Sequence, residues 1–264
     1  MTLPRRTSGN RRISELSEIL EEAYDRFARP EFIANDPIQI PKHFSDRRDA
    51  ETIGLITATI AWGQRKSIIA NAWKLARSMD EKPYDFIMNA TEGDLQKLDR
   101  FVHRTFNAID LRQFILSIRH LYTKYGGIEE AFLNDGSIGN MCKAISLFKQ
   151  RFFEIEHEKR TLKHVADPAK GSNAKRINMY LRWMVRPPDR GIDLGLWKKI
   201  TPSQLLVPLD VHTGRVSRGL KLLKRKQDDR KAVEELTAAL REFDPIDPVR
   251  FDIALFSMGI AAKR

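Results

Sequence analysis

Gly-Ser-Asn-Ala-Lys-Arg-Ile-Asn-Met-Tyr-Leu-Arg-Trp-Met-Val, residues 171–185, is the stretch that decides the fold. Gly171 and Asn173 are residue types that tolerate a positive φ, and a run with helical apolar spacing follows directly, so we predict a tight turn leading into a helix. Lys175 then lies in the first helical turn. The positive end of the helix dipole disfavours an ammonium there, so we expect a lowered pKa and a nucleophilic amine. The alternative is an ordinary surface lysine.

A second motif follows at residues 208–216, which read Pro-Leu-Asp-Val-His-Thr-Gly-Arg-Val. Asp210 precedes an apolar helical run, so we predict that it is the N-cap of a second helix, with its carboxylate beside free backbone donors. Capping alone is one interpretation of this residue. The other is a carboxylate that acts together with Lys175.

The two motifs together resemble the helix-hairpin-helix DNA glycosylase superfamily, which includes endonuclease III and the 8-oxoguanine glycosylases. The resemblance is carried by Gly171-x-x-x-Lys175-x-x-Asn and by Pro208-x-Asp210-x-His-x-x-Arg-Val. Within the superfamily, Arg-Trp-Met-Val-Arg at residues 182–186 and Gly-Ile-Asp-Leu-Gly-Leu-Trp at residues 191–197 are similar to an uncharacterised bacterial family.

The resemblance implies an all-α, two-lobed fold with the active-site cleft between the lobes. It implies that Lys175 is the Schiff-base lysine and that Asp210 is the catalytic aspartate. Two features depart from the pattern. Asn173 stands where the second hairpin glycine is expected, and the interval between Lys175 and Asp210 is longer than in endonuclease III, although it is similar to that of the archaeal 8-oxoguanine enzymes.

The composition of the chain favours some classes of partner and excludes some cofactors. The 264 residues carry a net charge of +11, which favours an anionic partner such as nucleic acid. The single cysteine, Cys142, excludes a disulfide or a cysteine-ligated iron–sulfur cluster within one chain, and the six histidines show no zinc-ligand spacing, so we expect no cofactor and no metal. We find no signal peptide and no run of ~20 apolar residues, and so expect a cytoplasmic, nucleoid-associated protein that does not enter a membrane.

Apolar spacing predicts helices along the whole chain. One ends before Pro30, one runs from Asp49 to Trp62 and is buried on most sides, and a polar corner at residues 63–66 precedes the next. We find no convincing period-two strand. We assign residues 1–48 and 205–264 to a terminal helical lobe and residues 49–204 to a central lobe, with the helix-hairpin-helix at about 160–185, because neither terminal region can close a core alone.

DNA contacts are expected chiefly at the hairpin. Backbone N–H groups near Gly171 and Asn173 would hold a phosphate, Lys170 and Arg176 add charge, and the resemblance implies that Gln64 reaches into the DNA. Gln64 is otherwise a loop residue. A flipped base needs stacking residues, for which the candidates are Trp62, Trp183, Trp197 and His212. For the tryptophans the alternative is a place in the core, and for His212 it is a structural role.

Three functions are consistent with these patterns. The first is a DNA glycosylase with AP-lyase activity that acts as a monomer on double-stranded DNA and excises a damaged, oxidised base. The second is a non-catalytic helical DNA-binding protein that kept the glycosylase fold. The third is a basic helical interaction module. Retention of both Lys175 and Asp210 favours the enzyme, because a pure binder does not need an acid at that position.

Overall fold

The computed structural model describes residues 8–261, so the ends of the predicted terminal lobe, residues 1–7 and 262–264, lie outside the described residues. The fold is mostly helical, as predicted. In chain order the elements are α1 Ser8–Phe27, 3-10 helix η1 Pro30–Asn35, α2 Gln39–Lys42, α3 Arg47–Thr59, α4 Arg65–Ser78, α5 Pro83–Asn89, α6 Glu92–Gln96, β1 Val102–His103, β2 Phe106–Asn107, α7 Ala108–Tyr125, η2 Glu130–Phe132, α8 Met141–Phe152, η3 Lys159–His164, η4 Pro168–Lys170, α9 Lys175–Val185, η5 Pro202–Gln204, α10 Val211–Gly219, α11 Arg230–Arg241, η6 Pro248–Arg250 and α12 Phe251–Ala261.

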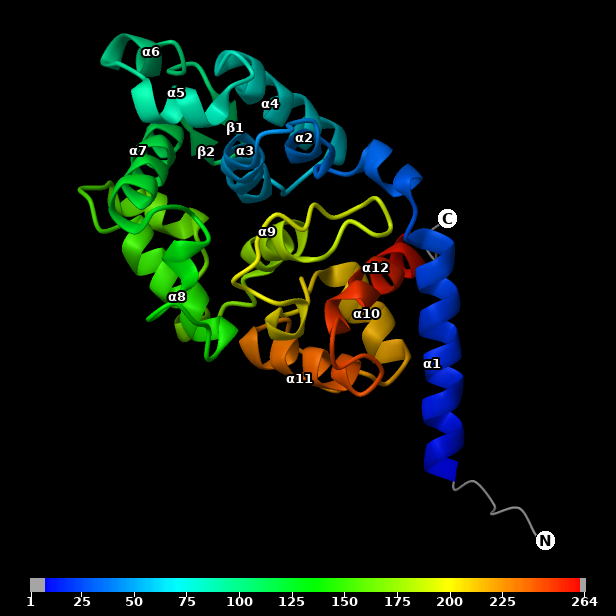
Figure 1. The fold of residues 1–264 in the computed structure, drawn as a ribbon. Helices are drawn as coiled ribbons and strands as arrows, with labels where there is room; N and C mark the ends of the chain where they lie inside the picture. Colours follow the sequence, from blue (N-terminus) through cyan, green and yellow to red (C-terminus); the bar gives the residue numbers. More distant parts are fainter. Residues whose placement is uncertain (1–7, 262–264) are drawn as a thin grey trace, which may run out of the picture.

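Helix α9 lies at the centre of the molecule, between the α2–α4 group and the α10–α12 group (Figure 1). It packs against α3, whose residues from Ala50 to Thr59 are all buried. Gly54 makes this contact close, because an added Cβ would lie 3.0 Å from Met184 Cε and 3.3 Å from a ring carbon of Tyr180. The buried helix predicted at 49–62 is therefore present, but it ends at Thr59, and the chain then turns through Gly63, where φ is +103°.

The first and the last helix of the described chain pack against each other. Helix α12 packs against both α1 and α10 (Figure 1). Helix α1 ends at Phe27, before Pro30, as predicted. Gly259 allows the α10–α12 approach, since a Cβ there would lie 2.8 Å from His212 Cβ and 3.0 Å from the His212 carbonyl oxygen. This packing fixes the start of α10, where Asp210 lies.

Two assignments differ from the sequence analysis. Helix α2, which falls in the predicted terminal lobe, packs against α3 and α4, and a Cβ added to Gly54 would lie 3.3 Å from Pro41 Cβ. Among residues 8–261 there is also a short antiparallel ribbon of β1 and β2, which pairs Val102 with Asn107 and His103 with Phe106. Two-residue strands are too short to show an alternating pattern, so no strand was predicted.

The hairpin predicted at about 160–185 is α-helical only in its second half. Its first half consists of the 3-10 helices η3 and η4. Pro168 opens η4, and the Asp167 side chain accepts hydrogen bonds from the backbone N–H of Ala169 at 3.0 Å and from Ser146 Oγ of α8 at 2.8 Å. These local polar contacts replace the bonds of a regular α-helix.

Candidate active site

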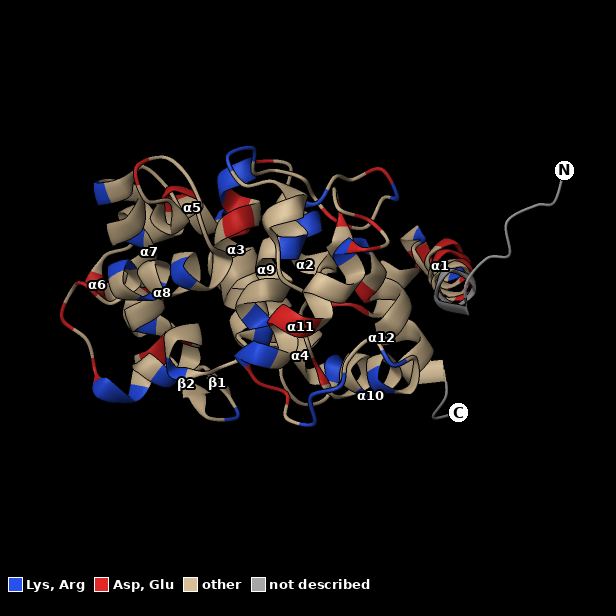
Figure 2. Ribbon diagram, turned by 90° about the horizontal axis from the view of Figure 1, so that it is seen from below, with Lys and Arg blue, Asp and Glu red and all other residues tan. Residues whose placement is uncertain are grey.

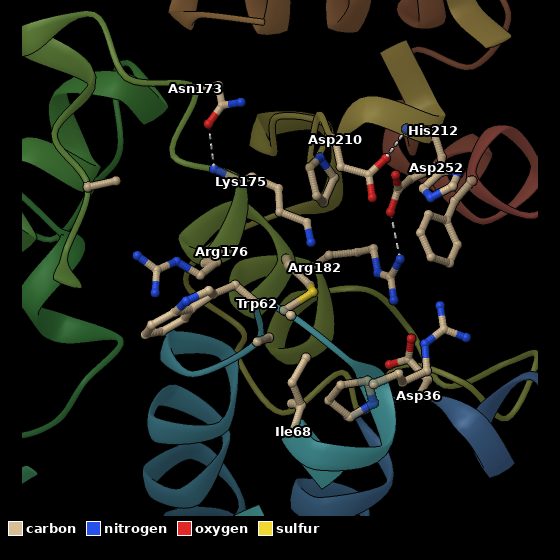
Figure 3. A pocket seen from close by; sticks show the side chains of 18 of the residues that line it. Asp36, Trp62, Ile68, Asn173, Lys175, Arg176, Arg182, Asp210, His212 and Asp252 are labelled. Atoms are coloured by element: carbon tan, nitrogen blue, oxygen red, sulfur yellow. Dashed lines mark hydrogen bonds and ion pairs between the residues drawn. The ribbon is translucent and has the colours of Figure 1, made fainter. Parts of the chain in front are cut away.

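A pocket of about 620 Å³ lies where α9, α10 and α12 meet the corner before α4 (Figure 3). Lys175 and Asp210 both line it, from α9 and from the start of α10. The sequence motifs therefore meet in one cavity. Of the other predicted site residues, four line the same pocket: Trp62, Asn173, Arg176 and His212.

Lys175 is the first residue of α9, as predicted. The turn before it has two left-handed residues, Gly171 with φ +86° and Ala174 with φ +47°. The second of these was expected at Asn173. Instead, the Asn173 side chain accepts the Lys175 backbone N–H at 3.2 Å and so takes the place of an N-cap side chain. Within residues 8–261 the Lys175 amine has no hydrogen-bond or ion-pair partner, and it points into the pocket (Figure 3).

Asp210 is the N-cap of α10, as predicted. Its Oδ1 accepts the backbone N–H groups of His212 and Thr213, both at 2.9 Å, and its other oxygen has no partner in the described part of the chain. Asn173 joins the two motifs, because its Nδ2 donates to the carbonyl of Leu209 at 3.2 Å. The residue that departs from the expected hairpin glycine thus ties the Lys175 turn to the chain just before Asp210.

A buried ion-pair network holds the floor of the pocket. Arg182 Nη1 donates to Asp252 Oδ2 at 2.6 Å, and Arg182 and Arg186 both pair with Asp193. Burial, aided by the charge of Asp210 and opposed by the charge of Arg182, raises the pKa of Asp252 to about 6. Because Asp252 belongs to α12, the network holds α9 against the helix that positions α10.

Arg176 and Trp62 form one wall of the pocket. The Arg176 guanidinium lies over the Trp62 ring, 4.7 Å from its centroid, and donates to the carbonyl of Thr59. Burial lowers the pKa of Arg176 to about 10, and within the described residues it has no carboxylate partner. The His164 ring stacks with Trp62, with centroids 6.0 Å apart. Arg176 is therefore a cation beside the pocket that no described carboxylate neutralises.

Several predicted residues lie outside this pocket. Trp197 is 1% exposed, stacks edge-on with Tyr180 and donates Nε1 to Glu51 at 2.6 Å, so it belongs to the core and not to a base pocket. Trp183 is also buried in the core. Gln64 is exposed at the N-cap of α4, next to the pocket residues Gly63 and Arg65.

Part of the hairpin backbone differs from the prediction. The N–H of Gly171 donates to the backbone carbonyl of Pro168 at 2.9 Å, and that of Ser172 donates to the backbone carbonyl of Asp167 at 3.3 Å. These donors are used within the turn, so they are not free for a phosphate. Lys170 is exposed beside them.

The sequence analysis missed several residues that line the pocket. They are charged or aromatic and come from four elements: Phe32, Asp36, Arg65, Arg182, Asp252 and Phe256. Helical spacing in the sequence could have identified some of them. Lys175, Met179 and Arg182 recur at i, i+4 and i+7 on α9, and Asp252 and Phe256 at i and i+4 on α12, so each set shares one helix face.

The charges are spread over the molecule. Figure 2 shows Lys and Arg on both the upper and the lower side of the view, interspersed with Asp and Glu. Between residues 8 and 261 there is no cluster of three or more His, Cys, Asp or Glu side chains that could hold a metal ion. Every helix in the same range is too short or too polar to cross a membrane.

The fold and the pocket define a helical protein with a lysine and an aspartate that line one pocket. Residues 36–261 match the protein family described as Protein of unknown function (DUF2400), and the chain belongs to this family. The matched region contains Lys175, Asp210 and the residues of the buried ion-pair network, Arg182, Arg186, Asp193 and Asp252. Comparisons with curated proteins and with solved structures gave no match.

Proposed function

We propose that this protein is a DNA repair N-glycosylase with AP-lyase activity, which excises a damaged, oxidised base from duplex DNA. We further propose that its helices form the two-lobed helix-hairpin-helix glycosylase fold, with α4 and α9 on one side of the cleft and α10 and α12 on the other. The observation that carries this proposal is the meeting of Lys175 and Asp210 in one pocket.

The chemistry follows from the two groups. After losing a proton, the Lys175 amine attacks C1′ of the sugar while the N-glycosidic bond breaks, and the departing base takes the bond's electron pair and a proton. The Asp210 carboxylate stabilises the cation-like sugar carbon during this step. Opening of the sugar ring then gives a protonated Schiff base between Lys175 and C1′. Loss of a proton from C2′ expels the 3′ phosphate and cuts the strand.

The pocket supports this assignment in two further ways. Its volume of about 620 Å³ falls within the range of small-molecule sites and is large enough for a flipped nucleotide. The Lys175 amine has no carboxylate bound to it in the described residues, so no local ion pair must be broken before it reacts. Arg176 and Lys163 line the same cavity and can neutralise the nucleotide's phosphates.

Borohydride trapping tests the proposal. Reduction should convert the Schiff base into a stable protein–DNA adduct on duplexes with an abasic site or an oxidised base, and Lys175→Gln should abolish that adduct. Lys170→Gln is the matched control, because it removes one charge from the same hairpin outside the pocket, and it should still form the adduct. DNA binding without an adduct in the unaltered protein would instead favour a non-catalytic DNA-binding protein.

A further inference from the structure

A groove of about 1250 Å³ lies away from the Lys175 pocket, with which it shares no lining residue. Its lining comes from the N-terminal part of α1, the end of α10 with the loop that follows it, and one face of α11. The volume exceeds the roughly 300–1,000 Å³ of small-molecule sites. The size of the groove therefore suits a segment of a macromolecule.

The first wall of the groove is an apolar stripe on α1. Ile13, Leu16 and Leu20 are spaced so that they share one face of this helix. Leu20 is fully buried, Leu16 is half-buried and Ile13 is 47% exposed. The exposure rises because α12 covers the C-terminal part of α1, and the N-terminal part runs on past it (Figure 1). The uncovered end of the stripe, at Ile13 and Leu16, lines the groove.

The second wall is a face of α11 with small side chains at its centre. Glu235, Ala238, Ala239 and Glu242 lie at i, i+3, i+4 and i+7, so they share this face, and all four line the groove. Ala238 is exposed and Ala239 is half-buried. Alanines at a contact surface allow a close approach, so a partner's apolar side chains can pack against this wall.

Three exposed lysines in the loop after α10 form a cationic rim of the groove, called here the lysine rim: Lys221, Lys224 and Lys226. None of their ammonium groups has a hydrogen-bond or ion-pair partner within residues 8–261. The loop itself is anchored, because Leu222 and Leu223 are buried and the Lys224 backbone N–H donates to Glu235 Oε1 at 2.6 Å. The rim therefore offers uncompensated positive charge at a fixed place beside apolar walls.

The chemistry of the lining distinguishes between possible occupants. Nucleic acid is disfavoured, since the lining arginine, Arg218, is already paired with Asp228, and the α1 and α11 walls present aliphatic side chains where bases need aromatic ones. A twofold contact with a second copy would bring two lysine rims into one interface. The first twelve residues of the chain carry four arginines and no acid, so they do not complement the lysine rim either.

We propose that this groove binds an acidic amphipathic peptide segment of a partner protein. Apolar side chains of the segment fill the space between Ile13, Leu16 and the alanines of α11, and its carboxylates pair with the lysine rim. Because the groove and the Lys175 pocket have no lining residue in common, this binding does not depend on the proposed base release.

The test selects peptides from a displayed random library on the full chain. Enriched peptides should combine Asp or Glu with large apolar residues, and a synthetic peptide of the enriched sequence should bind more weakly as the salt concentration rises. Fluorescence anisotropy measures its affinity. Ala238→Gln fills the groove from an exposed position, and Ile13→Gln removes an apolar contact. Each of these variants, and the pair Lys221→Glu with Lys224→Glu, should weaken binding by about 5- to 10-fold.

Matched variants change exposed positions outside the groove. The pair Lys82→Glu with Lys231→Glu alters the net charge equally, and Ile246→Gln removes an exposed apolar side chain, so both should keep the unaltered affinity. Circular dichroism melting shows whether each variant is folded.

Enrichment of peptides without acid, no enrichment, or unchanged affinity in Ala238→Gln and the Lys221 and Lys224 pair would overturn the inference. Weaker duplex binding in that pair with no enriched peptide would assign the lysine rim to nucleic acid, and loss of self-association in Ala238→Gln would assign the groove to a second copy. Either result also overturns it. A Lys175-dependent abasic adduct leaves the proposed function standing in all of these cases, and its absence leaves peptide binding untouched.

Discussion

Asp210 combines a structural and a proposed chemical role in one side chain. One oxygen caps α10, and the other has no partner within residues 8–261. An aspartate that served only as a cap could be replaced by asparagine at little cost, because both residues are good N-caps. The two roles can therefore be separated by a substitution that keeps the cap and removes the charge.

We expect Asp210→Asn to slow base release by about 100-fold or more, because the amide cannot stabilise a cation-like sugar. The free energy of unfolding should change by less than about 1 kcal/mol, since the cap remains. Single-turnover release assays and chemical denaturation measure the two effects. Asp229→Asn, at the N-cap of α11 outside the pocket, is the matched control and should leave release unchanged. Equal loss of release in both variants would assign Asp210 to capping alone.

Asp36 should make a measurable pH-dependent contribution to stability. Burial raises its pKa in the folded protein, so its ionised form is costly once the pH exceeds the unfolded value near 3.8. Asp36→Asn should therefore have a larger free energy of unfolding than the unaltered protein at pH 7, with the difference shrinking as the pH falls toward 4. Denaturation at several pH values measures it. A stabilisation independent of pH would contradict this account.

Asp46 should make a pH-dependent contribution to stability with the opposite sign to that of Asp36. Burial acts to raise the pKa of Asp46, but the backbone N–H groups of Arg48 and Asp49, together with the Arg48 side chain, outweigh it and lower the pKa. Its contribution is present above the unfolded pKa and is lost as the pH falls. Asp46→Asn should therefore have a smaller free energy of unfolding than the unaltered protein at pH 7. This difference should shrink as the pH falls, in the same denaturation experiment.

At the scale of elements, the site depends on how closely α10 and α12 approach. Gly259→Ala should lower the free energy of unfolding by about 1–3 kcal/mol, because its Cβ would overlap backbone and side-chain atoms of His212. Base release should also fall, since His212 lies two residues after Asp210. Gly219→Ala in α10 meets no heavy atom within 4 Å and should leave stability unchanged or raise it by up to about 1 kcal/mol. Denaturation curves compare the two, and equal losses would contradict the packing argument.

At the scale of the whole molecule, DNA affinity should be largely electrostatic. The net charge of +11 attracts DNA phosphates and does not distinguish base edges. The affinity for undamaged duplex should therefore fall steeply as the salt concentration rises. With about six phosphate contacts, affinity should drop roughly 10³-fold between 50 and 200 mM salt. Fluorescence anisotropy at several salt concentrations gives the slope. Salt-independent affinity, or no affinity at low salt, would contradict every role in DNA binding proposed above.

Local patterns determined the helical class and the two motif helices. The starts of α9 at Lys175 and α10 after Asp210 depend on turn and capping residues that lie within a few positions, so sequence reasoning predicted both. The same reasoning left Trp197 as a candidate for either a base pocket or the core, because an isolated tryptophan carries no local sign of burial. Its hydrogen bond to Glu51 joins residues far apart in the chain.

Only the tertiary structure decided what surrounds Lys175. Asp36 and Arg65 lie in segments distant from both motifs, and the pair of Arg182 with Asp252 forms because α9 and α12 are brought together. A charged side chain in a helical pattern has the same local spacing whether it faces solvent or a cavity. Helix α9 packs between the α2–α4 group and the α10–α12 group because apolar faces far apart in sequence are buried together. This packing determines which charged side chains face the pocket and which face solvent.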